Sequence, residues 1–107
     1  MIYKIRITKT AQTDMRGIYK YIADDLHNPD AASRRIMLID ETIKSLAENP
    51  ARFPRVRDSY LASKGYRVAV VKTHLILFII RDKTMSVSVM RVLYGRRDWF
   101  RILKGAQ

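Results

Sequence analysis

The hydrophobic period changes between the two halves of this chain, and that change decides its fold class. From about residue 10 to residue 48, apolar side chains recur every three or four positions, which predicts amphipathic helices. From residue 66 to residue 94 they alternate or run together instead, which predicts strands. A block of helices followed by a block of strands indicates an α+β fold, with the helices covering one face of an antiparallel sheet.

The first block predicts two helices joined by a short turn. One begins near Thr10, and the other follows Asn28, which can act as N-cap with Pro29 at the first helical position. Gly17 is a poor helix former inside the first helix. Pro50 disfavours helix in the residue before it, so the second helix should end around 48–49. The apolar stripes are Ala11, Met15, Ile18, Ile22 and Leu26 in the first helix, and Ala32, Ile36, Ile39, Ile43 and Leu46 in the second.

Strands are predicted on both sides of the helical hairpin. Tyr3, Ile5 and Ile7 alternate with polar residues and form a first strand. After an irregular segment, 50–64, three strands follow at 66–71, 74–80 and 85–94. Their connections are too short for a parallel crossover, so they form an antiparallel meander. Gly95 ends the last strand, and apolar residues within 99–103 predict a short closing helix.

Length and composition exclude several classes of protein. A chain of 107 residues has room for one domain, expected to span 1–107. Without cysteine there is no disulfide framework or thiolate zinc site, and two histidines exclude a histidine-rich metal site. The longest apolar run has six residues, too few to cross a membrane, and the N-terminus has no signal core. We therefore expect a cytoplasmic protein without metal or cofactor.

Positive charge is concentrated in one half of the sequence. Residues 1–51 hold 8 basic and 7 acidic side chains, whereas residues 52–107 hold 13 basic and 3 acidic ones. The net charge is +11. This asymmetry predicts a basic face that favours a polyanion: nucleic acid, a ribosome, an acidic protein or anionic lipid. A generally basic soluble protein is the alternative.

Four stretches, taken in order, resemble the RelE/ParE superfamily of bacterial type II toxin–antitoxin toxins, which includes plasmid-stabilisation proteins. They are Ala11-x-x-Asp14-x-x-x-Ile18-x-x-Tyr21-Ile22-Ala23, Asn49-Pro50-x-Arg52-Phe53-Pro54, Gly65-Tyr66-Arg67 and Arg91-Val92-Leu93-Tyr94-Gly95-Arg96-Arg97-Asp98. Each stretch is short, but the ordered set covers nearly the whole chain.

The resemblance implies a toxin with a cognate acidic antitoxin as partner. RelE-like members are ribosome-dependent, metal-independent endoribonucleases that cut mRNA, which makes the ribosome and mRNA the expected partners and translation inhibition the expected effect. ParE-like members share the fold, lack that activity and inhibit DNA gyrase. We interpret the basic half and its arginines as favouring RNA cleavage; gyrase inhibition, or an inactive relic that only binds its antitoxin, is the alternative.

Cleavage without a metal needs a base, an acid and cations that stabilise the phosphorane. By the resemblance, Arg67 and Arg97 match phosphate-contacting arginines and are the predicted catalytic residues. Strand parity directs Arg67 with Ala69 and Val71, and on an open basic surface it should contribute little to stability. Alternatively, the alkyl stem of Arg67 covers the sheet and Arg97 pairs with Asp98.

Four further side chains are candidate substrate contacts: Lys64, Arg91, Arg96 and Trp99. Arg91 shares its parity with an apolar series, Val87, Val89 and Leu93, so it must find a partner or a groove. It either joins a basic cluster with Arg67 or lies at an edge and reaches solvent. Trp99 either stacks on a base or closes the core.

The acid and the base are harder to assign. RelE-like enzymes often use a C-terminal tyrosine, and this chain has no tyrosine, histidine or acid after Asp98. His74 titrates near neutral pH and Tyr94 lies near the predicted basic cluster, so both are candidates. A polar turn residue and a packed strand residue are the respective alternatives.

One face of the predicted sheet has no helix to cover it. Tyr66, Val68 and Val70 alternate with Ala69 and Val71, so both faces carry apolar side chains. The hairpin can cover only one of them. The other face is therefore predicted to present apolar surface beside arginines, as interfaces do.

Overall fold

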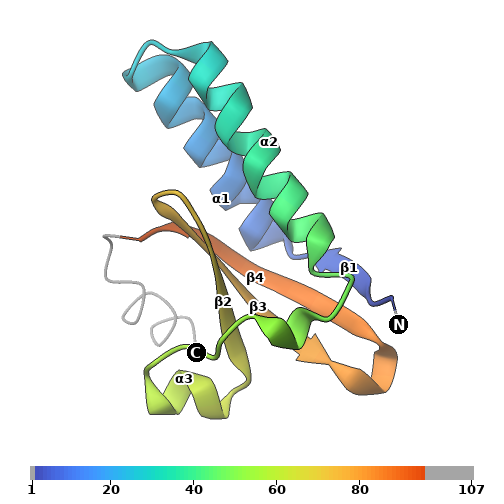
Figure 1. Ribbon diagram of the computed structural model, residues 1–107. Helices are drawn as coiled ribbons and strands as arrows, with labels where there is room; N and C mark the ends of the chain where they lie inside the picture. The colour runs from blue at the N-terminus through green and yellow to red at the C-terminus, as the bar shows by residue number, and fades with distance from the viewer. Residues whose placement is uncertain (1, 96–107) are drawn as a thin grey trace.

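The computed structural model describes residues 2–95 and shows a helical hairpin packed against one face of a four-stranded sheet (Figure 1). The α+β fold is as predicted. Its elements are β1 (Lys4–Ile7), α1 (Lys9–Lys20), a π-helical turn (Tyr21–Asp25), α2 (Pro29–Ser45), a 3₁₀ turn (Pro50–Arg52), α3 (Ser59–Ser63), β2 (Tyr66–Val71), β3 (His74–Arg81), a second 3₁₀ turn (Asp82–Thr84) and β4 (Ser86–Tyr94).

Local side-chain caps set where the two long helices begin. The Thr8 side chain accepts a hydrogen bond from the Ala11 amide, and the Asn28 side chain accepts one from the Ala31 amide. Pro29 occupies the first turn of α2, where its missing N–H costs nothing. The predicted cap and start of the second helix are confirmed. The two helices lie side by side (Figure 1).

The second helix ends at Ser45, a few residues before the predicted end. The Arg52 guanidinium donates to the carbonyls of Ser45, Glu48 and Asn49, so it satisfies backbone acceptors that a longer helix would use. Asn49 then turns the chain with a positive φ of 46°. The helix ends early because an arginine later in the chain caps it.

The sheet has the order β1-β4-β3-β2. β2, β3 and β4 form the predicted antiparallel meander, and β1 runs parallel to β4 with Lys4 opposite Ser86 and Ile7 opposite Val89. β1 is much shorter than β4. Within the described residues, β4 therefore has no neighbouring strand on that side beyond Val89.

Each face of the sheet has its own apolar core. The core on the hairpin side buries residues of α1, α2 and the strands: Ala11, Ile39, Ile43, Leu46, Ala69, Val71, Ile76, Phe78, Val87, Val89 and Val92. A smaller core on the other face buries Val56, Leu61, Leu77 and Leu93.

The segment 50–64, expected to be irregular, contains the short helix α3. The Asp58 carboxylate caps it by accepting from the Leu61 amide at 2.9 Å. Leu61 is buried against the second face of the sheet, so most of the apolar surface predicted there is covered. Val70, 66% exposed on the edge strand β2, is left open.

A β-bulge corrects the predicted orientation of Arg91. Phe78 pairs with Val89 while Leu77 pairs with Arg91, so Met90 is an extra residue in β4. Arg91 therefore does not share the parity of Val89. Simple alternation fails here because one inserted residue exchanges the two faces.

Asp14 of α1 fastens the helix to the open part of β4. Its carboxylate accepts from Arg91 Nε at 2.8 Å and Nη2 at 2.9 Å, and from the Val92 amide at 3.0 Å. The Asp14 and Arg91 side chains are 13% and 21% exposed. The predicted need of Arg91 for a partner is met by Asp14, and Arg91 does not join Arg67 in a basic cluster.

We expect Asp14→Ala to lower the free energy of unfolding by about 3 kcal/mol, because it leaves a half-buried guanidinium unpaired and an amide uncapped. Asp40→Ala is the control, since the exposed Asp40–Lys44 pair on α2 should contribute less than about 1 kcal/mol. Denaturant unfolding measures both variants. Equal losses of unfolding free energy in the two variants would mean that Asp14 does not hold α1 to β4.

Candidate functional site

Arg67 points toward the hairpin side of the sheet, as its parity predicts, but it does not lie on an open surface. Its Nη1 donates to the carbonyl of Phe53 at 2.7 Å and to that of Ala51 at 3.3 Å. These bonds tie β2 to the loop after α2. The expectation that Arg67 has no fixed partner is wrong, and part of its donor capacity is used by the fold.

Lys64 lies at the C-terminal end of α3, on the surface. Its ammonium is 5.4 Å from the centroid of the Tyr60 ring, a cation–π contact. The neighbouring Arg55 donates to the Ala62 carbonyl at 3.5 Å and forms an isolated β-bridge with Arg67. Arg55 thus links α3 to β2 beside Arg67, and Lys64 lies at the end of the same short helix.

Arg91 and Arg67 do not form a joint cluster, because Arg91 bonds to Asp14 and Arg67 bonds to the carbonyls of Ala51 and Phe53. Hydrogen bonding to Asp14 raises the pKa of Arg91, and burial opposes this shift. Tyr66, whose pKa is raised mainly by burial, lies close enough to Arg91 and Arg81 for their charges to oppose that shift. The positive charge on the sheet is therefore partly neutralised within the fold.

His74 belongs to a different part of the molecule. It is 6% exposed, and its Nδ1 lies 3.0 Å from Arg35 Nη1, which also donates to the Thr73 hydroxyl. Because a guanidinium only donates, Nδ1 is the acceptor. Burial, and secondarily the Arg35 charge, lowers the pKa of His74.

Tyr94, the second candidate acid or base, contacts His74. The two rings meet edge to face with centroids 5.9 Å apart. His74 pairs with Val71, four residues along β2 from Arg67. At about 3.3 Å per residue, the backbones at these positions are roughly 13 Å apart. The structure brings His74 and Tyr94 together and keeps both away from Arg67.

His74 and Tyr94 lie in the wall of a groove of about 880 Å³, here called the α1 groove. It runs between α1 with its π-helical turn, the start of α2, the β2–β3 turn and the end of β4. Its lining residues are Thr13, Asp14, Gly17, Ile18, Tyr21, Ile22, Leu26, Ala31, Arg35, Thr73, His74, Val92, Leu93 and Tyr94.

Gly17 lines this groove in the middle of α1. A methyl group added there would meet no atom within 4 Å, so the packing of the chain does not require glycine. Glycine at this position costs α1 about 1 kcal/mol relative to alanine. Gly95, in contrast, ends β4 at a crowded point, because an added Cβ would lie 3.2 Å from the Thr73 carbonyl oxygen.

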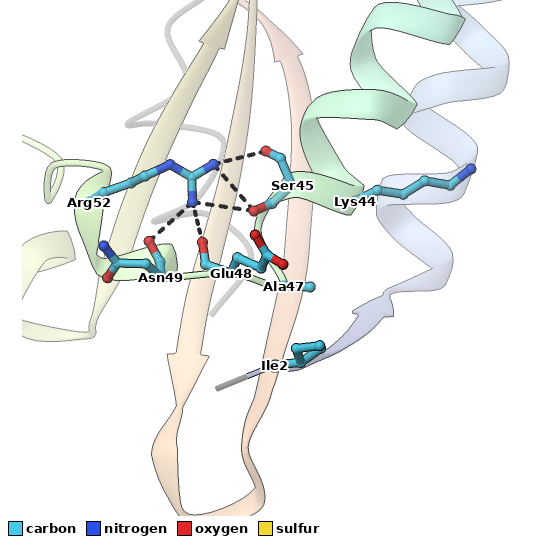
Figure 2. A pocket seen from close by; sticks show the side chains of 7 residues that line it. All are labelled: Ile2, Lys44, Ser45, Ala47, Glu48, Asn49 and Arg52. Atoms are coloured by element: carbon cyan, nitrogen blue, oxygen red, sulfur yellow. Dashed lines mark hydrogen bonds between the residues drawn. The ribbon is translucent and has the colours of Figure 1, made fainter.

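A second hollow, of about 460 Å³, lies at the end of α2 (Figure 2). Figure 2 shows the Arg52 guanidinium directed at Ser45, Glu48 and Asn49. It also lies 4.4 Å from the Phe53 ring centroid. Arg52 therefore caps a helix here, which explains its place in the sequence pattern without a ligand.

Three predicted site residues, Arg96, Arg97 and Trp99, lie outside the described residues, as does the predicted closing helix. Within residues 2–95, no group of three or more histidine, aspartate or glutamate side chains is placed to hold a metal ion. In the same part of the chain, no helix is both long and apolar enough to cross a membrane.

Sequence reasoning did not assign Arg35, Gly17 or Asp14 to a site. Arg35 reads as a polar residue of an amphipathic helix, and its partner His74 is 39 residues away. Gly17 was noticed as a poor helix former inside the first helix, but the sequence does not show that it lines a groove. Asp14 is part of the sequence pattern from Ala11 to Ala23, but only the structure shows that it binds Arg91.

Comparison with known proteins defines the class of this chain. Residues 5–99 match the family model described as the ParE toxin of the type II toxin–antitoxin system parDE. The chain therefore belongs to this family of toxins, within the RelE/ParE superfamily. No curated protein sequence is significantly similar to it.

Solved structures share the fold at low sequence identity. A chain of the chromosomal ParDE toxin–antitoxin system from P. aeruginosa aligns with a TM-score of 0.71 and 19% identity over 87% of this chain and 96% of that one. A chain of the RelBE2 toxin–antitoxin complex of Mycobacterium tuberculosis aligns with a TM-score of 0.66 and 22% identity, over 88% of this chain and 92% of that one. A doubly substituted E. coli toxin RelE in the free state aligns with a TM-score of 0.68 and 12% identity over the full length of both chains.

Because the pKa of His74 is lowered in the folded state, the unfolded chain takes up the proton first. Stability from this residue is present above its ordinary pKa of about 6.5, falls as the pH drops below that value, and levels off once the folded state is protonated. We expect His74→Gln to flatten the dependence of the unfolding free energy on pH in this window.

The control for this experiment is Ser33→Ala, a change of an uncharged side chain at an exposed position of α2. It should leave the slope unchanged. An unaltered slope in His74→Gln would show that His74 does not couple folding to protons.

Arg67→Ala should lower the free energy of unfolding by about 1–2 kcal/mol, because two loop carbonyls lose a charged donor. Arg57→Ala is the control, since Arg57 is exposed in the loop between the 3₁₀ turn and α3. It should change the free energy of unfolding by less than about 0.5 kcal/mol. Thermal unfolding followed by circular dichroism tests this. A melting temperature unchanged by Arg67→Ala would mean that Arg67 contributes little to stability, as expected of a side chain on an open surface.

Proposed function

We propose that this toxin acts in the cytoplasm by binding DNA gyrase and blocking it, and that an acidic antitoxin neutralises it. ParE-like members of the superfamily behave in this way, and the match to the ParE family model over residues 5–99 is the observation that carries the proposal. The net charge of +11 suits an acidic antitoxin.

The state of the arginines supports a binding role over RNA cleavage. A catalytic cation must be free to meet charge that develops on the phosphate. Arg67 instead holds two backbone carbonyls, and Arg91 holds the Asp14 carboxylate through two bonds. His74 donates no proton from Nδ1 and lies far along the sheet from Arg67.

Ribosome-dependent mRNA cleavage is the second candidate. It is favoured by the 13 basic side chains in residues 52–107. In this proposal Arg67 and Arg97 stabilise the transition state, Lys64, Arg91, Arg96 and Trp99 bind RNA, and His74 or Tyr94 transfers protons.

Two assays with the purified protein distinguish the candidates. In the first, gyrase supercoils a relaxed plasmid with ATP; we expect the toxin to inhibit this reaction and the antitoxin to restore it. In the second, ribosomes are incubated with mRNA; we expect intact mRNA. Cleavage with normal supercoiling would overturn the proposal in favour of the RelE-like activity.

If cleavage is seen, Arg67→Ala should slow it by about 10²–10³-fold, the effect of losing one preformed donor to a developing anion. Arg67→Lys should restore only part of the rate, since it keeps the charge but loses the bidentate fork. Inactivity in both assays, with no arrest of growth on expression, would instead identify a relic.

A further inference from the structure

We propose that the second face of the sheet binds the phosphate backbone of duplex DNA at the end where β3 turns into β4, so that the toxin contacts the DNA held by gyrase as well as the enzyme. Three cations on neighbouring strands make this site, here called the β1–β3 patch: Lys4, Arg6 and Arg81. Contact with the DNA on gyrase rests on the proposed function, whereas binding of DNA by the free toxin does not.

Strand register brings the three cations onto one face. Lys4 of β1 pairs with Ser86 of β4, which in turn pairs with Arg81 of β3. Arg6 pairs with Ser88, one step further along the same face. The residues that alternate with these belong to the core on the hairpin side: Ile5, Ile7, Ile80, Val87 and Val89. The patch therefore faces away from the helical hairpin, where β1 lies beside β4 (Figure 1).

Arg81 is oriented by the fold but keeps most of its donors. Its Nε donates to the Ser88 hydroxyl at 3.0 Å, and its side chain is exposed. Within residues 2–95, no hydrogen bond or ion pair engages its two terminal nitrogens. The terminal nitrogens of Arg67 and Arg91, in contrast, bond within the fold. A guanidinium with an oriented and unoccupied fork is suited to bidentate contact with a phosphate.

The positive charge of the patch is not neutralised by ion pairs among the described residues. Lys4 and Arg6 are exposed, and neither has a carboxylate partner there. Asp82 follows Arg81 in the chain, but its carboxylate accepts a hydrogen bond from the Tyr3 hydroxyl at 2.8 Å. Because Tyr3 packs against the core on the hairpin side, this bond draws the Asp82 carboxylate toward that side. The patch thus favours an anionic ligand.

The spacing of the cations suits a chain of phosphates. Lys4 and Arg6, two residues apart on one strand, are about 7 Å apart at the backbone, and Lys4 and Arg81, two strands apart, are separated by about 10 Å. Successive phosphates of a nucleic acid meet such cations one by one, so the like charges stay apart. A single small anion would require all three to converge.

Duplex DNA is favoured over a single strand because the exposed aromatic rings lie away from the patch. Proteins that bind single strands combine cations with aromatic side chains on which the bases stack. In the part of the chain that the structure describes, the exposed aromatic side chains belong to α1, the π-helical turn, α3 and the last residue of β4: Tyr19, Tyr21, Tyr60 and Tyr94. Cations alone make the backbone contacts by which proteins hold a duplex.

The experiment measures how the full-length toxin binds a short fluorescein-labelled DNA duplex, by fluorescence anisotropy at several salt concentrations. The triple variant Lys4→Gln, Arg6→Gln, Arg81→Gln should bind about tenfold more weakly at low salt. The slope of log affinity against log salt should become shallower by about 2.7, since each lost phosphate contact removes about 0.9.

The matched control removes three charges from exposed positions of the helical hairpin: Arg16→Gln, Lys20→Gln and Arg34→Gln. Its slope should stay within about 0.5 of the wild-type value. Ser88→Ala keeps every charge but removes the acceptor that orients Arg81. It should leave the slope unchanged and weaken binding about threefold, because the fork is no longer pre-organised.

Folding is checked by the melting temperature of each variant. Lys4 and Arg6 are exposed, so replacing them should leave the melting temperature close to that of the wild type. If the triple variant unfolds, the double variant Lys4→Gln, Arg6→Gln decides instead, with an expected change in slope of about 1.8.

The outcomes separate this inference from the proposed function. Equal slopes in the two triple variants would overturn the patch, and a poly(U) strand bound more tightly than the duplex would overturn the choice of duplex DNA. A patch variant that inhibits supercoiling as strongly as the wild type would overturn contact with the DNA on gyrase. Supercoiling unaffected by the wild-type toxin would overturn the proposed function, and anisotropy would still decide whether the patch binds DNA.

Discussion

The Asp14 carboxylate holds the helical hairpin to the sheet beyond Val89, where β4 continues without β1 beside it. β1 pairs with β4 only as far as Val89, and α1 begins immediately after β1. The Thr8 hydroxyl donates to the Val89 and Met90 carbonyls, and Asp14 then receives the Val92 amide. Two polar side chains of one helix thus serve backbone groups that a longer β1 would have paired.

The same arrangement creates the α1 groove. Because a helix rather than a strand borders the end of β4, the space between them is wider than a strand pairing would leave, and it is lined by side chains from α1, α2 and the sheet. The clamp at Asp14 and the open position at Gly17 are three residues apart on one helix, so they lie on neighbouring parts of its surface. Asp14 stabilises the fold, whereas Gly17 lowers the stability of α1 without any packing requirement for glycine.

Features that depend on neighbouring residues were predictable from the sequence. The Asn28 cap with Pro29, the three C-terminal strands and the direction of Arg67 all follow from local chemistry or from period two. The bulge at Met90 was not predictable, because nothing in the sequence distinguishes the inserted residue from its neighbours. Since that insertion exchanges the faces, the setting of Arg91 was missed as well.

The candidate site was less predictable than the fold, for the same physical reason. Parity indicates where Arg67 points but not that the Phe53 carbonyl, 14 residues earlier, lies there to receive it. The contact between Arg35 and His74 joins residues on two elements whose relative placement is set by packing. A short helix such as α3 has too few residues for a periodic signal, yet it covers much of the second face of the sheet.

The contacts of Arg67 and Arg91 bear on which kind of activity their surroundings can support. A guanidinium has five donors, and each one given to a carbonyl or carboxylate within the fold is lost to a phosphate. Arg91 gives two to Asp14, and Arg67 bonds two carbonyls from one nitrogen. Binding a protein target needs only charge and shape at the surface, so it tolerates arginines that are fixed in this way. Catalysis of phosphodiester cleavage needs free donors in a common site, and Arg67 and Arg91 each give part of their donor capacity to contacts within the fold.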